Sequence, residues 1–167
     1  MLQTAQELEK ETGTVESRWS LVHAYYRIGD ACEKGGHAGK AETYYNISEK
    51  LCRELRQEAD TVNFQTDHAV ILGSLSYVNR VEGHLEEAGV WEQEALELRK
   101  RLVRETGTVE ARGNLGSSYR NLVSIYEARE RLTEARQSYE EGLKLWRRLA
   151  EETGTIKART FVGALCE

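Results

Sequence analysis

Proline is absent from this sequence of 167 residues. Proline breaks helix interiors, so its absence, beside abundant Glu, Leu, Arg and Ala, predicts an all-helical chain. Cysteine is scarce, and three cysteines at unrelated spacings argue against a disulfide framework. No apolar run approaches the roughly 18 residues that a membrane-spanning helix needs, and the first residues have no signal-peptide pattern. We therefore expect a cytoplasmic domain that makes no contact with a membrane.

Positive charge is not in surplus, since the formal net charge is -5. A phosphate-binding face would require local clustering of basic residues, and the basic run Arg99-Lys100-Arg101 is short and has acidic neighbours. We therefore expect no nucleic acid among the partners of this chain.

Motifs for catalysis, nucleotide binding and metal binding are missing as well. The sequence contains no CxxC, HExxH, GxSxG, GxGxxG or P-loop pattern. His37 and His84 are 47 residues apart, which indicates a repeated turn and not a metal site. No pair of carboxylates stands out as a catalytic pair. We expect a protein that is not an enzyme and that holds no cofactor and no metal.

A pentapeptide recurs along the chain. It begins at Glu11, Glu105 and Glu152, with spacings of 94 and 47 residues, and a degenerate copy begins at Glu58. These positions share a period of 47 residues, and such a period is typical of repeat architectures. We expect a single repeat domain over 1–167. Its parts are a partial helix, three full units and a final partial unit: 1–10, 11–57, 58–104, 105–151 and 152–167.

Each pentapeptide is predicted to join two helices. Its third residue suits the left-handed conformation that ends a helix, and these residues are Gly13, Asp60, Gly107 and Gly154. Its fourth residue offers a side-chain oxygen as the next N-cap, and these residues are Thr14, Thr61, Thr108 and Thr155. A second break lies mid-unit, near Gly36, Gly83 and Glu130. The predicted helices cover 2–11, 15–34, 38–59, 62–82, 85–106, 109–129, 132–153 and 155–165.

Apolar residues within the predicted helices recur at intervals of three and four, so each helix has one buried stripe. A single pair of helices cannot bury both of its stripes, and neighbouring pairs must therefore stack. A column of small residues, Ala41, Ala88 and Ala135, is predicted to be almost fully buried where helices approach closely.

Two polar residues interrupt the buried columns. His68 aligns with two leucines, and we expect a core histidine bonded to a neighbour. Glu92 aligns with Tyr45 and Tyr139. Here we expect a slight shift of the helix face that places Trp91 in the stripe instead of a functional buried acid.

Aromatic, aliphatic and small residues recur at fixed positions of the third unit, and these are Tyr119, Leu122, Val123, Tyr126, Ala135, Tyr139 and Gly142. This unit resembles the tetratricopeptide repeat, whose pattern is aromatic, Leu-Gly, Tyr, Ala, aromatic and small. The first unit matches partly, through Tyr25, Ile28, Gly29, Ala41, Tyr45 and Ser48, and the second unit matches less well. The family's usual period is about 34 residues, so the longer unit looks like the extended arrays of bacterial multi-repeat proteins. The resemblance implies an all-α, right-handed superhelical α-solenoid of antiparallel helix pairs.

The resemblance also implies a concave surface, lined by the first helix of each pair, that holds a peptide or helix of another protein. Aromatic and arginine side chains are typical interface anchors. The candidate ligand-binding residues are Tyr26, Asp30, Tyr77, Arg80, Arg120 and Glu127. The family's Lys/Asn clamp for a C-terminal carboxylate is missing, which disfavours a chaperone-tail adaptor.

We therefore expect a protein- or peptide-binding scaffold. Three alternatives stay open: the candidate residues are merely a solvated face, the chain is a peptide-sensing regulatory domain of a larger signalling protein, or it is an enzyme built on helix pairs.

The end of the sequence predicts a further contact. Ile156, Phe161, Val162 and Leu165 lie where no second helix follows to cover them. Because natural arrays close with a polar capping helix, we expect either more repeats in a parent protein or end-to-end association with a second copy.

Overall fold

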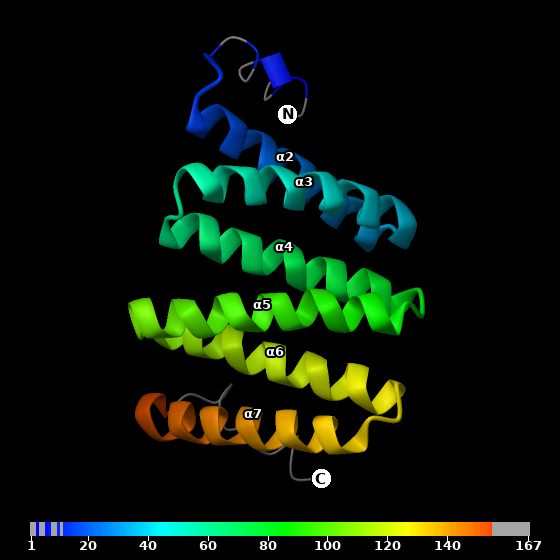
Figure 1. Cartoon of the computed structure of the whole chain (residues 1–167), viewed down its shortest axis with the longest axis vertical. Coiled ribbons are helices and arrows are strands. Elements are labelled where there is room, and N and C mark those ends of the chain that lie inside the picture. Colours follow the sequence, from blue (N-terminus) through cyan, green and yellow to red (C-terminus); the bar gives the residue numbers. More distant parts are fainter. Residues whose placement is uncertain (1–2, 4–5, 8–9, 11, 155–167) are drawn as a thin grey trace. The chain divides into compact units, whose positions relative to one another are not determined.

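The computed structural model describes residues 3, 6, 7, 10 and 12–154. In these ranges no residue forms a strand, and six helices follow in chain order (Figure 1). They are α2 (Val15–Lys34), α3 (Ala38–Glu58), α4 (Val62–Val81), α5 (Leu85–Thr106), α6 (Val109–Ala128) and α7 (Leu132–Thr153). Each differs from its predicted boundaries by at most one residue. The helix predicted at 155–165 lies outside the described residues, as does most of the helix predicted at 2–11.

Threonine caps begin the first helix of each pair, as predicted. The side-chain oxygens of Thr14, Thr61 and Thr108 each accept a hydrogen bond from the backbone N–H three residues later, at 3.2, 3.3 and 3.1 Å. These bonds satisfy one of the donors that a helix start leaves unpaired. Thr155, the fourth predicted cap, lies outside the described residues.

The prediction for Asp60 was wrong. Gly107 takes the left-handed conformation with φ of 60°, but Asp60 does not. Helix α3 already ends at Glu58, and the next residue, Ala59, is extended with φ of -149°. The Asp60 carboxylate instead accepts a hydrogen bond from Arg56 Nε at 2.7 Å. The chain therefore leaves this helix without a left-handed residue.

The mid-unit turns do use left-handed residues. Gly36 and Gly83 have φ of 77° and 84°, and Glu130 takes the same conformation with φ of 56°. A side chain in this conformation is strained by roughly 1–2 kcal/mol. Among the described residues, Glu130 is the one non-glycine residue with positive φ.

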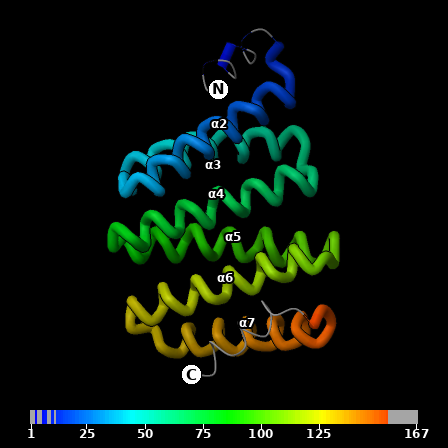
Figure 2. The backbone as a smooth tube through the Cα atoms, turned by 180° about the vertical axis from the view of Figure 1, so that it is seen from behind, coloured from blue at the N-terminus to red at the C-terminus, as the bar shows by residue number. Residues whose placement is uncertain are grey.

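The chain divides into two compact units, 1–91 and 92–167, and the division falls within α5. In the first unit α2 packs on α3 and α3 packs on α4, which Figure 2 shows from behind. The core between these helices consists of Val22, Ala41, Tyr45, Cys52, Leu55, Ile71, Leu75 and Val78. Ala41 and Ala88 are wholly buried, which confirms the small-residue column in this unit.

Tyr45 determines how closely α2 and α3 approach. Its ring is fully buried and lies against Gly29, where an added methyl group would come within 2.7 Å of the ring carbons. Its hydroxyl donates a hydrogen bond to Glu33 Oε2 at 2.8 Å. Gly29 therefore makes room for the aromatic residue of the facing helix.

In the second unit α6 packs on α7. Leu96, Leu115 and Leu122 form a buried cluster. Ala135 is only 5% exposed, so the column prediction is confirmed here as well.

Candidate functional site

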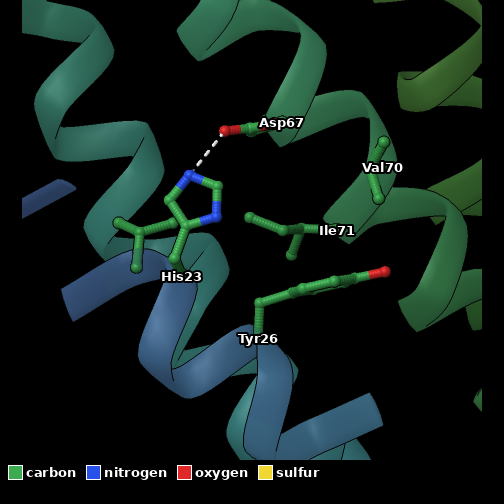
Figure 3. A pocket seen from close by; sticks show the side chains of 6 residues that line it. His23, Tyr26, Asp67, Val70 and Ile71 are labelled. Atoms are coloured by element: carbon green, nitrogen blue, oxygen red, sulfur yellow. Dashed lines mark ion pairs between the residues drawn. The ribbon is translucent and has the colours of Figure 1, made fainter. Parts of the chain in front are cut away.

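A cavity of about 60 Å³ opens between α2 and α4 in the first unit. Figure 3 shows its labelled side chains pointing from the two helices toward one another. It is lined by Val22, His23 and Tyr26 of α2 and by Asp67, Val70 and Ile71 of α4.

The polar edge of this cavity is an ion pair between the two helices. His23 Nε2 lies 2.9 Å from Asp67 Oδ2, and the side chains are 46% and 31% exposed. The Trp19 ring meets the His23 ring edge-on at 4.9 Å and also contacts Phe64 at 4.1 Å between ring centroids. These contacts hold the imidazole at the cavity while leaving the imidazole and the carboxylate accessible to solvent.

The remaining walls are apolar. Tyr26 is half-buried, with its ring centroid 5.5 Å from that of Tyr45, and Ile71 is buried. Val70 is exposed, although valine is more often buried. The cavity thus combines an apolar interior with one carboxylate.

Two other predicted residues lie together further along α4. Tyr77 is 45% exposed, and the Arg80 guanidinium carbon lies 5.4 Å from the centroid of its ring. Asp30, predicted on α2, forms an ion pair with Lys34 at 2.7 Å. Tyr26 is therefore the one predicted site residue that lines the α2–α4 cavity.

The predicted residues of the second compact unit, 92–167, lie elsewhere. Arg120 lines a small cavity of about 10 Å³ between α6 and α7, together with Val123, Tyr139 and Trp146 among others. Glu127 is exposed on α6.

A buried polar cluster joins α3 and α4. The His68 side chain is 1% exposed, and its Nε2 lies 3.1 Å from Glu49 Oε1 while its Nδ1 lies 2.8 Å from Arg56 Nη1. Since arginine can only donate, Nδ1 accepts and Nε2–H donates to Glu49. The prediction of a core histidine bonded to a neighbour is confirmed. Burial raises the pKa of Glu49, but the bonds from His68 and Arg53 outweigh this and hold its pKa below the ordinary value.

A second buried cluster joins α5 and α6, and here the prediction was wrong in part. Trp91 is half-buried and packs against the core of its unit, as expected. Glu92 is nevertheless fully buried in the tyrosine column, so the helix face does not shift. Arg99 Nη1 and Asn121 Nδ2 each donate to the Glu92 carboxylate at 3.1 Å, and Arg99 also donates to Ser118. These partners compensate the cost of burying the carboxylate. Burial lowers the pKa of Arg99, and the charge of Glu92 opposes that effect.

Sequence reasoning missed Arg99 and Asn121. Glu92 and Arg99 are seven residues apart on one helix face, and this spacing was the available signal. Asn121 lies on the next helix, and no local pattern links it to Glu92.

The Cys52 thiol is buried, and burial raises its pKa to about 12. In the part of the chain that the structure describes, no group of three or more His, Cys, Asp or Glu residues is placed to hold a metal ion. None of the described helices is both long and apolar enough to cross a membrane.

Comparisons with known proteins agree with this architecture. Among solved structures, the crystal structure of BtubC (BKLC) from P. vanneervenii matches 98% of this chain at 21% identity and a TM-score of 0.66. This chain spans 61% of the length of that protein. The de novo designed helical repeat protein DHR64 matches 98% of this chain and 87% of its own at 18% identity, with a TM-score of 0.44. The six described helices, with no strand among the described residues, make this an all-α helical-repeat fold.

Residues 111–152, which lie within α6 and α7, match the tetratricopeptide repeat family model. This part of the chain is therefore similar to a tetratricopeptide repeat. No curated protein sequence matches it significantly.

Proposed function

We propose that this chain is a scaffold that binds a peptide or helix of another protein on the face lined by the first helices of its pairs. The observation that carries the proposal is the α2–α4 cavity, which includes the predicted anchor Tyr26 and the exposed Val70. Concave apolar sites with a few convergent polar groups are the usual form of binding sites.

The neighbouring part of α4 supports the same surface. Tyr77 exposes almost half of its area to solvent and has Arg80 over its ring. Tyrosine and arginine are enriched among residues that dominate binding energy. An extended ligand that fills the cavity would continue toward Tyr77 along the same helix.

We further propose that the chain is an extended, bacterial-type array with a 47-residue unit that acts in the cytoplasm. The starts of the first helices, Val15, Val62 and Val109, support this unit length. Helical-repeat folds typically serve as non-catalytic scaffolds, and the proposed partner is a protein or peptide.

Selection from a phage-displayed library of random dodecapeptides tests the binding face. We expect the wild-type chain to enrich related peptides and Val70→Lys to lose them, because the new charge blocks the cavity mouth. The matched control is Val90→Lys, which makes the same change at a valine that is 65% exposed on α5. Failure to enrich any peptide, or equal loss in both variants, would contradict the proposal.

We also propose end-to-end association through the terminal repeats. Val123, Tyr139 and Trp146 are only half-buried on the last described pair, which supports a partner for that face. Light scattering over a concentration series tests this, and a strictly monomeric mass at every concentration would contradict it.

A further inference from the structure

We propose that the α2–α4 cavity selects a partner segment that carries an aliphatic side chain and, within about two residues of it, a lysine or arginine that pairs with Asp67. This inference rests on the proposed function, because it specifies the ligand of the same site.

The size of the cavity points to an aliphatic side chain. One water molecule needs roughly 10–15 Å³ of such a space, so a cavity of about 60 Å³ accommodates about four waters or a branched side chain of three or four carbons. The walls formed by Val22, Tyr26, Val70 and Ile71 match that chemistry.

The charge at the cavity edge points to a basic group. Asp67 forms one ion pair among the described residues, with His23, and an imidazole is positively charged only when it is protonated. The arginines of the neighbouring α3 have carboxylates of their own: Arg53 pairs with Glu49 and Arg56 with Asp60. The Asp67 carboxylate is 31% exposed, so an incoming cation can reach it without a change in the fold.

The spacing between the aliphatic and the basic residue of the partner follows from the positions of Val70 and Asp67 on α4. Asp67 and Val70 are three residues apart on α4, so their Cβ atoms lie about 5–6 Å apart on one face. An extended peptide advances about 3.3 Å per residue. A side chain above Val70 and a cation at Asp67 therefore belong to residues no more than about two positions apart.

Arg80, the other charged residue of α4, does not favour an acidic partner residue at the cavity. Arg80 lies 13 residues beyond Asp67, which corresponds to about 20 Å along the helix axis, and its guanidinium lies over Tyr77. An acidic partner residue would meet Arg80 well outside the cavity.

The dodecapeptide selection described above, followed by synthetic peptides, tests this inference. A selected peptide and its Lys→norleucine analogue, which keeps the four side-chain carbons and removes the ammonium group, are compared by fluorescence anisotropy. We expect the analogue to bind the wild-type chain about fivefold more weakly. This ratio should approach one in Asp67→Asn and stay unchanged in the matched control Glu54→Gln, which removes an exposed carboxylate from α3.

Salt titration of the wild-type chain gives a readout that needs no variant. The lysine peptide should lose affinity with added salt more steeply than its norleucine analogue. Enriched peptides that lack basic residues, that are acidic, or whose lysine preference survives in Asp67→Asn would overturn the inference and leave the proposed function standing. A selection that enriches nothing would overturn the proposed function itself.

Discussion

The buried pair of Glu92 and Arg99 makes a large stability effect predictable from one substitution. In Arg99→Met the Glu92 carboxylate, which is 0% exposed, keeps one hydrogen-bond partner among the described residues, Asn121. Removing one partner of a buried ion pair typically costs about 3–5 kcal/mol, because the remaining charge stays desolvated. We expect Arg99→Met to lower the free energy of unfolding by that amount.

The double variant Glu92→Leu/Arg99→Met separates the cost of the orphaned charge from the value of the pair. Replacing a buried pair by apolar residues is often neutral or stabilising by about 1–4 kcal/mol. We therefore expect the double variant to be more stable than Arg99→Met alone. A surface control is Arg136→Met: Arg136 is 82% exposed and 2.9 Å from Glu140, and its loss should cost less than about 1 kcal/mol.

Urea unfolding followed by circular dichroism measures all three differences. The free energy of unfolding of a native protein is typically about 5–15 kcal/mol, and Arg99→Met is expected to remove a large part of it. The urea concentration at the midpoint of unfolding should therefore fall clearly. If Arg99→Met costs no more than Arg136→Met, or if the double variant is less stable than Arg99→Met, the carboxylate is not buried and paired as described.

Three further predictions concern single residues. Gly29→Ala should lower the free energy of unfolding by about 1–3 kcal/mol, because its methyl group meets the buried Tyr45 ring at 2.7 Å; an unchanged thermal midpoint would show that the ring yields. Glu130→Gly should raise that free energy by up to about 1 kcal/mol in urea unfolding, because φ of 56° strains a side chain; a decrease would contradict this. Glu49 has a lower pKa in the folded protein than in the unfolded chain, so its ionised carboxylate stabilises the fold, and stability should fall as the pH drops below about 5. Glu49→Gln removes this carboxylate and its ion pair with Arg53 and should therefore flatten the slope in acid titrations; an unchanged slope would refute this.

Most of the backbone could be predicted from local signals. The threonine caps and the alanine column depend on residues close in sequence and on one spacing rule, and the structure places them as expected. Asp60 could not be predicted in this way, because the side chain of Arg56 offers its carboxylate a partner and the helix ends one residue earlier.

The partners of the buried polar groups could not be predicted from local sequence, because these partners lie on other helices. Glu92 conflicts with its column when the sequence alone is considered, yet Asn121, 29 residues later, donates to its carboxylate. His68 was predicted to have a neighbour, but the choice of Glu49 depends on how α3 packs on α4. At the candidate site, the helical spacing of the sequence predicted Tyr26 but not Asp67. Asp67 contacts His23 only because α2 and α4 are adjacent in the fold.

The two polar clusters also explain why neighbouring 47-residue repeats have such different residues at equivalent positions. Glu49 has leucines at its equivalents, Leu96 and Leu143, and its partner His68 has a leucine at Leu115. A buried polar residue thus occurs together with a complement on the facing helix, as does Glu92 with Asn121 of α6. Transferring one member alone to an equivalent position would bury an unpaired polar group, at a cost of roughly 1–3 kcal/mol or more. The helix pairs therefore share a backbone plan, while the buried polar contacts make the α3–α4 and α5–α6 interfaces distinct.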